Sequence, residues 1–292
     1  MRLRITVPAS TANLGPGFDA FGMALGLHDV VEAHLVDTGL KVEVVDAGAG
    51  DMADVPTDET HLVVRALRRT CEHLGTELPG LHLRCHNAIP HARGLGSSAA
   101  AVVAGISAGY AFAGKAVDDA ALQLAAGFEG HADNAAASLY GGFVIAWRAG
   151  ERFHAERLRP HEAIRPVVAV PEARSSTGET RGLLPAQVPH ADAAFTAGRA
   201  ALAVHALTAR PDLLLAATDD RLHQGYRAPA YPASLRLVQA LREHGVAAAI
   251  SGAGPTVLAL TTTGILPGDV AVEGFDVFEL PVAHSGVQVA AG

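Results

Sequence analysis

A glycine- and serine-rich segment, PHARGLGSSAA at residues 90–100, has the residue types that bind phosphate groups. Gly94 and Gly96 permit positive φ angles and a close approach of the backbone to a ligand. Ser97 and Ser98 stand where an alanine-rich helical stretch begins, so their hydroxyls would join free backbone N–H groups and the positive end of the helix dipole. The segment predicts a loop that wraps backbone donors around a polyphosphate. The candidate loop residues are Pro90, His91, Ala92, Arg93, Gly94, Leu95, Gly96, Ser97, Ser98, Ala99 and Ala100.

This segment differs from the Walker pattern of P-loop proteins. No Lys-Ser/Thr pair closes it, and Lys115 lies far downstream. The same residues also suit a tight strand-to-helix turn, in which the glycines provide the geometry and the serines cap the helix. Taken alone, the segment leaves both interpretations open.

Two further glycine-rich segments bear on this choice: PASTANLGPGFDAFG at residues 8–22 and SGAGPTVLAL at residues 251–260. Together the three segments resemble the GHMP kinases, a superfamily that includes galactokinase and the homoserine, mevalonate and phosphomevalonate kinases. The resemblance spans most of the chain and implies an α+β GHMP kinase fold. Residues 1–165 would form an ATP-binding N-terminal lobe like domain 2 of ribosomal protein S5, and residues 166–292 a ferredoxin-like C-terminal lobe.

Within the superfamily, the amino-acid sequences of several segments are most similar to those of the homoserine kinases. These segments are EGHADN at 129–134, STGETR at 176–181 and HQGYR at 223–227, besides the N-terminal segment itself. The resemblance implies ATP-dependent phosphorylation of L-homoserine to O-phospho-L-homoserine in threonine biosynthesis, with ATP and Mg2+ as cofactors and an active site between the lobes.

The same resemblance implies which residues bind the amino acid substrate. Asp19 would meet its ammonium group, and Arg181 and Arg227 would surround its carboxylate, which suits the bidentate geometry of a guanidinium group. The other residues implied in substrate binding are Asn13, His131, Gly252 and Gly254.

Residues near the reacting atoms are implied in the same way. Asp133 and Asn134 belong to the family's H-x-D-N pattern, and Asp133 is the nearest candidate for a general base, although Asn134 is the alternative residue to face the reaction. Thr177 would lie near the acceptor hydroxyl. Ser98 and Glu129 are the candidate magnesium ligands.

Each of these residues also has an ordinary structural interpretation. Asn13 could shape a turn, and His131 could cap the helix expected to begin near residue 133. Arg181 and Arg227 could be surface charges, the default for arginine. Their coincidence with several motifs favours the functional interpretation.

Three other functions remain as alternatives. The first is another GHMP kinase of the mevalonate or sugar type. A pocket for an isoprenoid alcohol would lack the paired arginines. The second is a non-catalytic regulator of the same fold, for which an eroded phosphate loop would be expected. The third is a nucleotide-binding structural module.

Composition and charge narrow the partners. Hydrophobic residues make up 49% of the 292 residues and charged residues 18%, which is typical of an ordered globular protein. The net charge of -8 disfavours nucleic acid. Cys71 and Cys85 lack the spacing of a disulfide framework or a zinc site and are expected to be core thiols. No leader or membrane-spanning run is recognised, so we expect a cytoplasmic protein without a membrane partner, and the resemblance suggests a homodimer.

The pattern of apolar residues predicts the elements that position these side chains. Helices are expected at residues 59–74, 98–112, 118–126, 133–140, 190–208 and 233–244. Strands are expected at 3–7, 81–88, 143–148, 153–158, 164–170, 246–250 and 256–261, with mixed strand signals beyond. Residues 30–36 and 40–45 are predicted to form a hairpin around a turn at 37–39, and residues 8–25 to be irregular.

Overall fold

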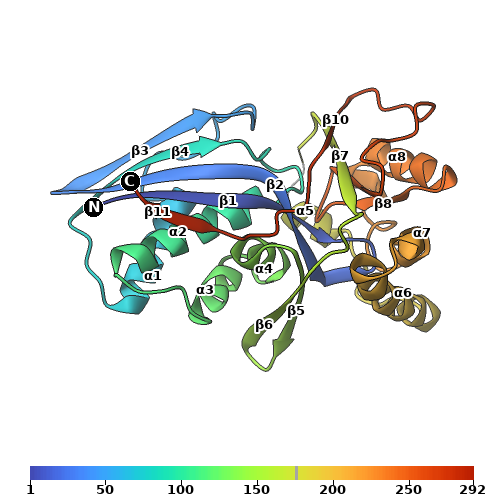
Figure 1. Ribbon diagram of the computed structural model, residues 1–292, viewed down its shortest axis with the longest axis horizontal. Helices are drawn as coiled ribbons and strands as arrows, with labels where there is room; N and C mark the ends of the chain where they lie inside the picture. Colours follow the sequence, from blue (N-terminus) through green and yellow to red (C-terminus); the bar gives the residue numbers. More distant parts are fainter. Residues whose placement is uncertain (175–176) are drawn as a thin grey trace.

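Two β-sheets organise the chain, as the computed structural model shows for residues 1–174 and 177–292 (Figure 1). The first sheet has the strand order β11-β1-β2-β4-β3, and β5 and β6 extend it from β2. The second sheet has the order β10-β7-β9-β8. These mixed helices and sheets confirm the predicted α+β class.

The first sheet is built mostly from the N-terminal half of the chain. Its strands are β1 (Arg2–Asn13), β2 (Gly17–Val36), β3 (Gly39–Asp46), β4 (Gly80–Asn87), β5 (Phe143–Ala149), β6 (Arg152–Leu158) and β11 (Gln288–Ala291). Helices α1 (Leu62–Leu74), α2 (Ser97–Phe112), α3 (Ala120–Glu129) and α4 (Asp133–Tyr140) cover one face of this sheet (Figure 1). As predicted, α2 is largely buried, because its alanines and valines face the sheet on one side and α1 on the other.

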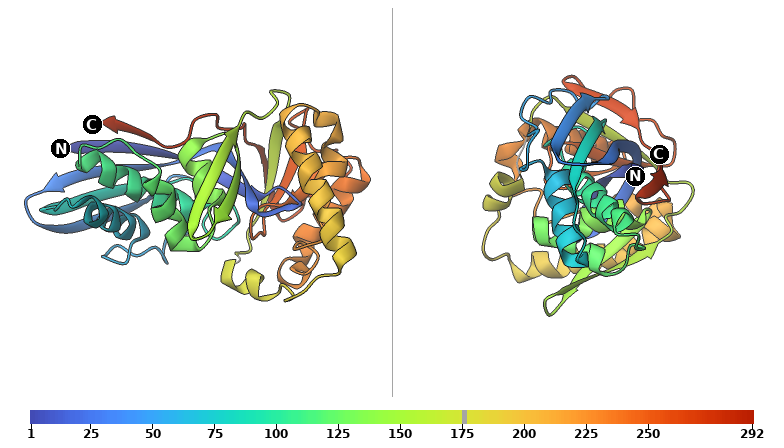
Figure 2. Two further views of the ribbon diagram at one scale, coloured as in Figure 1. Left: turned by 90° about the horizontal axis from the view of Figure 1, so that it is seen from below. Right: turned by 90° about the vertical axis from the view of Figure 1, so that its left-hand side faces the viewer.

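The second sheet carries the remaining helices (Figure 2). Its strands are β7 (Arg165–Pro171), β8 (Ala247–Ile250), β9 (Val257–Thr261) and β10 (Phe275–Glu279). The helices are α5 (Thr177–Gly182), α6 (His190–Thr208), α7 (Leu214–Ala217) and α8 (Pro232–Glu243), with short 3-10 turns at Pro211–Leu213 and Ala228–Ala230. No helix in the described part of the chain is both long and apolar enough to cross a lipid bilayer.

The predicted hairpin of residues 30–36 and 40–45 is wrong. Strand β4 lies between β2 and β3, antiparallel to β2 and parallel to β3. A Cβ at Gly80, the first residue of β4, would lie 2.6 Å from the carbonyl carbon of Thr38, so β4 enters the sheet directly against the turn. The turn residues were recognised correctly, but the alternating pattern of two strands does not specify which strand lies next to each.

The prediction that residues 8–25 are irregular is also wrong. Most of this segment continues β1 and β2, which pair antiparallel with register shifts at Pro8/Ala9 and Ala12/Asn13. The chain turns only at residues 14–16, where Gly15 has a φ of +88°. The long β1–β2 hairpin therefore carries the N-terminal glycine-rich segment from the first sheet to the second.

The C-terminal strand returns to the first sheet. Strand β11 pairs antiparallel with β1, with Leu3 opposite Ala291. Residues 166–292 thus contribute strands to both sheets: β7 to β10 lie in the second sheet and β11 in the first. The expected domain boundary near residue 165 stays a prediction.

Candidate active site

The glycine loop (residues 90–100) joins β4 to α2, and its surroundings require glycine at two positions. Gly96 has a φ of +71°, and a Cβ there would lie 2.1 Å from Ser10 Oγ. Gly94 has a φ of +79°, and a Cβ there would lie 2.3 Å from the carbonyl oxygen of Ser251. Each glycine thus lets another glycine-rich segment lie directly against the loop.

Hydrogen bonds hold the three glycine-rich segments together. Ser251 Oγ donates to Gly94 O at 2.6 Å and lies 2.8 Å from Thr11 Oγ1. Ser10 Oγ donates to Asn134 Oδ1 at 3.0 Å. Ser10 and Ser251 were not among the predicted site residues, although both lie inside recognised segments. Three segments that are far apart in the sequence therefore meet at one place.

A cavity of about 260 Å³, which we call the α2 cavity, opens at the N-terminus of α2. The glycine loop, the connection between α3 and α4, and the C-terminal glycine-rich segment form its walls. Its lining residues are Ala92, Gly94, Gly96, Ser97, Ser98, Ala99, Glu129, His131, Asn134, Gly252, Ala253 and Gly254. The first N–H groups of a helix lack intrahelical partners and favour anions, so the cavity suits phosphate groups.

Some predicted loop residues do not line this cavity. Leu95 is fully buried in the core. The Arg93 guanidinium donates instead to the carbonyl oxygens of Pro171 (2.9 Å) and Glu172 (2.8 Å), which tie the loop to the end of β7. His91 and Ala100 line the neighbouring cavity described next, and Pro90 lines neither.

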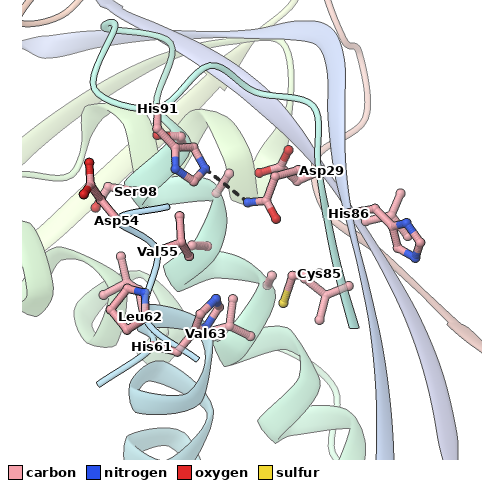
Figure 3. Close-up of a pocket in the computed structure, with 18 residues that line it drawn as sticks. Asp29, Asp54, Val55, His61, Leu62, Val63, Cys85, His86, His91 and Ser98 are labelled. Atoms are coloured by element: carbon pink, nitrogen blue, oxygen red, sulfur yellow. Dashed lines mark hydrogen bonds between the residues drawn. The ribbon is translucent and has the colours of Figure 1, made fainter. Parts of the chain in front are cut away.

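A second cavity, of about 250 Å³, adjoins the α2 cavity through Ser97 and Ser98, which line both (Figure 3). We call it the apolar cavity, because Val55, Leu62 and Val63 and the alanines of α2 form much of its wall. Its other lining residues include Asp29, Asp54, Pro56, His61, Cys85, His86, Asn87 and His91. Apart from His91, Ser97, Ser98 and Ala100 of the glycine loop, no motif in the sequence marks the residues of this cavity, which was not predicted.

Three polar atoms of described residues that line the apolar cavity are buried without a hydrogen-bond partner, and one of them, His86 Nε2, belongs to a ring that points away from the cavity (Figure 3). Among the described residues, neither His61 Nδ1 nor Asn87 Oδ1 has a hydrogen-bond partner. The Asn87 amide nitrogen lies 3.1 Å from His91 Nε2, which orients the amide group. Because buried polar groups normally find a partner, the cavity suits a flat, mostly apolar ligand that carries hydrogen-bonding atoms.

The predicted magnesium ligands, Ser98 and Glu129, both line the α2 cavity. Burial raises the pKa of Glu129, and a hydrogen bond from the Ser98 hydroxyl acts in the opposite direction. No cluster of three or more His, Cys, Asp or Glu side chains in the described part of the chain has the arrangement of a metal site. Magnesium commonly takes one or two protein oxygens and completes its shell with phosphates and water, so this pair fits such a cation.

His131, Asp133 and Asn134 form a small hydrogen-bonded group at the start of α4. His131 Nδ1 lies 3.0 Å from Asp133 Oδ1, which also accepts the backbone N–H of Asn134 at 2.7 Å. The bond to Asp133 raises the pKa of His131, and Glu129 and Asp19 add to this effect. The Asp133 side chain is buried, whereas His131 and Asn134 line the α2 cavity. Asn134 is therefore better placed than Asp133 to face a ligand.

Asp19 and Arg181 form a bidentate ion pair beside this group. The two Nη atoms of Arg181 donate to Asp19 Oδ2 and Oδ1 at 2.8 and 2.7 Å. The Arg181 guanidinium also lies over the Phe18 ring, 5.4 Å from its centroid. Two residues predicted to bind opposite ends of an amino acid thus contact each other.

Arg227 is almost completely buried, with 1% of its surface exposed. Its guanidinium donates to the carbonyl oxygens of Thr180 (3.3 Å) and Gly252 (3.4 Å) and lies on the Phe18 ring at 5.4 Å. Burial lowers its pKa. Direct contact between Arg227 and a substrate stays a prediction, since the described contacts place it beneath the site.

Asn13 connects two other predicted residues. Its side-chain amide donates to Gly252 O at 2.8 Å, and its Oδ1 accepts the backbone N–H of Asp19 at 3.0 Å. With a φ of +70°, Asn13 also shapes the β1–β2 turn, which is its alternative, structural interpretation. Thr177 begins α5, but its side chain lies outside the described residues.

Comparisons with known proteins agree with this arrangement. The family model described as "GHMP kinases N terminal domain" matches residues 61–142, and the model "GHMP kinases C terminal" matches residues 199–266. A homoserine kinase of Rhodococcus erythropolis is 52% identical over 97% of this chain and 94% of its own length. One of Streptomyces avermitilis is 53% identical over 88% of this chain and 85% of its own length.

A solved structure supports the same relationship. The crystal structure of homoserine kinase from Cytophaga hutchinsonii superposes with a TM-score of 0.85 at 27% sequence identity and covers 99% of this chain and 97% of that one. The predicted GHMP kinase fold is confirmed. The chain therefore belongs to the GHMP kinase superfamily and, within it, to the family of homoserine kinases.

Proposed function

We propose that this kinase transfers the γ-phosphoryl group of ATP to the side-chain hydroxyl of L-homoserine, giving O-phospho-L-homoserine for threonine biosynthesis. The observation that carries the proposal is the convergence of three glycine-rich segments on the α2 cavity, next to the Asp19–Arg181 pair. The cavity supplies anion-binding backbone groups, and the pair supplies one charge of each sign for an amino acid.

The donor nucleotide would occupy both cavities. Its phosphates would lie at the N-terminus of α2, against the glycine loop, and its base in the apolar cavity. Ser97 and Ser98 line both cavities, so one molecule can extend from one to the other past these residues. The apolar wall suits a planar base, and His61 Nδ1 and Asn87 Oδ1 offer it polar contacts.

Ser98 and Glu129 would hold a magnesium ion together with the phosphates. When bound, the ion neutralises charge on the transferred group and orients it. A cation beside Glu129 would also stabilise the carboxylate, whose pKa burial raises. These two side chains therefore favour a metal-bound phosphate at this end of the cavity.

Homoserine would bind between Asp19 and Arg181. Its ammonium group would pair with the Asp19 carboxylate, and its carboxylate would pair with the Arg181 guanidinium. Arg227, buried behind the Phe18 ring, would add positive charge. Binding of the substrate would thereby break the Asp19–Arg181 ion pair and form two ion pairs between the protein and the substrate. This exchange keeps both charged side chains paired, which limits the cost of removing them from water.

Phosphoryl transfer depends mainly on positioning and charge stabilisation. Asn134, fixed by Ser10, would orient groups at the cavity, and Asp133 would hold His131 and the start of α4. Asn134, which lines the cavity, or Thr177, by its place in the family pattern, would then lie closest to the acceptor hydroxyl, and Asp133 would act on the site through the His131 ring. We further infer a cytoplasmic enzyme, as expected from the sequence, and, from the resemblance alone, a homodimer.

A coupled assay tests the proposal directly. Purified protein receives Mg2+-ATP with L-homoserine, mevalonate or galactose in separate reactions, and ADP formation is followed. We expect turnover with homoserine alone. Turnover with mevalonate or galactose but not homoserine would replace the acceptor assignment, and the absence of turnover with all three would favour a non-catalytic regulator.

A further inference from the structure

His223, in the HQGYR segment, is a buried histidine without an assigned role. Its side chain has 0% exposed surface. Nε2 lies 2.8 Å from the carbonyl oxygen of Gly15, and Nδ1 lies 3.4 Å from an Nη atom of Arg227. The ring stacks on Phe18 with 5.2 Å between centroids. His223 therefore contacts the β1–β2 hairpin of the first sheet and an arginine of the second lobe at once.

The two partners fix the protonation of the ring. Gly15 O is an acceptor, so Nε2 carries the hydrogen; the Arg227 guanidinium is a donor, so Nδ1 accepts. A second proton on Nδ1 would face the arginine charge. The other charged groups nearby are the carboxylates of Asp220, whose Oδ2 lies 3.7 Å from Nε2, and Asp19. Burial is the largest influence and lowers the pKa of His223, so the ring is neutral.

The β1–β2 turn at residues 14–16, which His223 contacts through Gly15 O, packs tightly against the second lobe. A Cβ on Gly15 would lie 2.3 Å from Thr218 O, so the turn lies directly against the second lobe. Asp220 in turn fixes the histidine backbone, because its carboxylate accepts the N–H groups of Leu222, His223 and Gln224 at 2.8 to 3.1 Å. Four residues beyond Gly15, the chain reaches Asp19.

A second path joins the same groups. Arg227 and Asn13 both donate to Gly252 O, and Asn13 accepts the backbone N–H of Asp19. His223 and Gly252 O thus connect Asp19, on the first sheet, with Arg227, which lies in a turn of the second lobe. Loss of the His223 bonds would leave the hairpin tip connected to Arg227 by the path through Asn13 and Gly252 and by the contact of Arg227 with the Phe18 ring.

We propose that His223 is a positioning residue for the acceptor substrate: as a neutral Nε2–H tautomer it joins the Gly15 carbonyl to Arg227 and so sets the spacing between Asp19 and Arg227. The inference rests on the proposed substrate role of Asp19. His223 itself is covered by Phe18 and the hairpin, so it acts through these neighbours and does not touch the substrate.

Two substitutions at His223 separate hydrogen bonding from packing, and a third, at Asp19, tests the proposed function. Phe in His223→Phe keeps a ring against Phe18 but removes both hydrogen bonds. Gln in His223→Gln provides one donor and one acceptor without a titrating group. Asp19→Asn tests the proposed function on its own. We expect His223→Phe to raise the KM for homoserine about tenfold, with the KM for ATP changed less than about twofold, and His223→Gln to restore most of the loss.

A spectroscopic measurement gives a readout independent of activity. Long-range 15N–1H correlation spectra of the wild-type protein, with the His223 signals assigned by their absence in His223→Gln, should show a hydrogen on Nε2 and none on Nδ1. We expect this pattern to persist from pH 8 to pH 5.5, below the ordinary histidine pKa of about 6.5.

The outcomes are distinct. An unchanged homoserine KM in a folded His223→Phe protein, equal rises in the homoserine and ATP KM values, or a hydrogen on Nδ1 would each overturn the inference. If His223→Phe does not fold, failure of His223→Gln to keep the homoserine KM within about threefold of wild type would overturn it. An unaltered homoserine KM in Asp19→Asn would instead overturn the proposed role of Asp19, whatever the His223 variants do.

Discussion

Asp19 on β2 and Arg181 on α5 meet in a two-bond ion pair, 162 residues apart in the sequence. Their side chains remain 35% and 41% exposed. An ion pair of this exposure contributes only about 0–1 kcal/mol to folding. Stability alone therefore gives little reason for this geometry, and the proposed role in substrate binding can be tested separately from folding.

We therefore expect Asp19→Ala and Arg181→Ala each to raise the KM for homoserine by about tenfold or more, because each removes a charged hydrogen-bond partner of the amino acid. Thermal unfolding should change little. Arg165→Ala is a matched control, because Arg165 forms a similar exposed pair with Glu279 at 2.8 and 2.7 Å, away from the cavities. Similar kinetics of the Arg165 and Arg181 variants would contradict the substrate role.

Gly96→Ala tests the contact between the glycine loop and the N-terminal glycine-rich segment. The new Cβ would meet Ser10 Oγ at 2.1 Å, so Ser10 and its bond to Asn134 must shift. Gly114→Ala, with a φ of +65° and open space around it, bears the left-handed strain alone, about 1–2 kcal/mol. We expect Gly96→Ala to lose more stability in urea unfolding than Gly114→Ala and to lose most of its activity. Equal losses of stability in both variants would show that the positive φ angle, and not the contact with Ser10, determines the effect of Gly96→Ala.

Glu129→Gln addresses the proposed magnesium site. The amide retains the shape of the carboxylate but not its charge, so the free Mg2+ concentration for half-maximal activity should rise about tenfold. Glu72→Gln, at an exposed position of α1, provides the control. A magnesium titration that is identical for Glu129→Gln and wild type would exclude Glu129 as a ligand.

Asp29 is expected to make stability depend on pH. Its Oδ1 accepts the N–H groups of Ala88 (2.7 Å) and Ile89 (2.9 Å), just before the glycine loop. Burial nevertheless raises its pKa from 3.8 to about 6. The native state therefore holds this proton more tightly, and the associated stability is present below pH 3.8 and lost as the pH rises through about 6.

Asp29→Asn keeps the acceptor oxygen and removes the charge. The variant should be more stable than wild type at pH 8 by about 1–3 kcal/mol, and the difference should shrink as the pH falls to 4. Urea unfolding at several pH values measures it. Asp46→Asn should show the opposite sign, because backbone N–H groups of Gly48 and Gly50 lower the Asp46 pKa. A pH-independent difference for Asp29→Asn would contradict the raised pKa.

Ala101→Leu fills part of the apolar cavity from α2. If the nucleotide base binds there, the KM for ATP should rise about tenfold while the KM for homoserine stays nearly constant. Ala111→Leu, a partly buried position near the other end of α2, controls for overpacking of the helix. A larger effect on homoserine than on ATP would place the base elsewhere.

Much of the local structure could be predicted from the sequence. Residues 190–208 were predicted as a helix and form α6 with those bounds, since the segment follows Pro189 and is rich in alanine, the residue that most favours a helix. The glycine loop on its own also suited a strand-to-helix turn, and it was recognised because two further glycine-rich segments accompany it in the chain. Residue type and local spacing were sufficient for these elements, in contrast to the pairing of β2 and β3.

Partner choice and cavity shape could not be predicted in the same way. Strands β2 and β3 look like neighbours because a turn joins them, yet β4 separates them through contacts made only in the folded chain. The apolar cavity is lined by residues such as Val55, Val63 and Ala104, which resemble core residues in any sequence. His223 was read as part of a motif, but its bond to Gly15 depends on how two lobes pack.

The position of strand β11 means that the first sheet needs the last residues of the chain. This strand pairs with β1, and Gly292 N–H donates to Arg2 O at 3.0 Å, so the two ends of the chain lie together (Figure 1). During synthesis, every strand of the second sheet emerges before the first sheet gains this outer strand. Domains normally fold in the order in which they are made. Here the outer edge of β1 can gain its partner only after residues 288–291 have been synthesised, which is later than every strand of the second sheet.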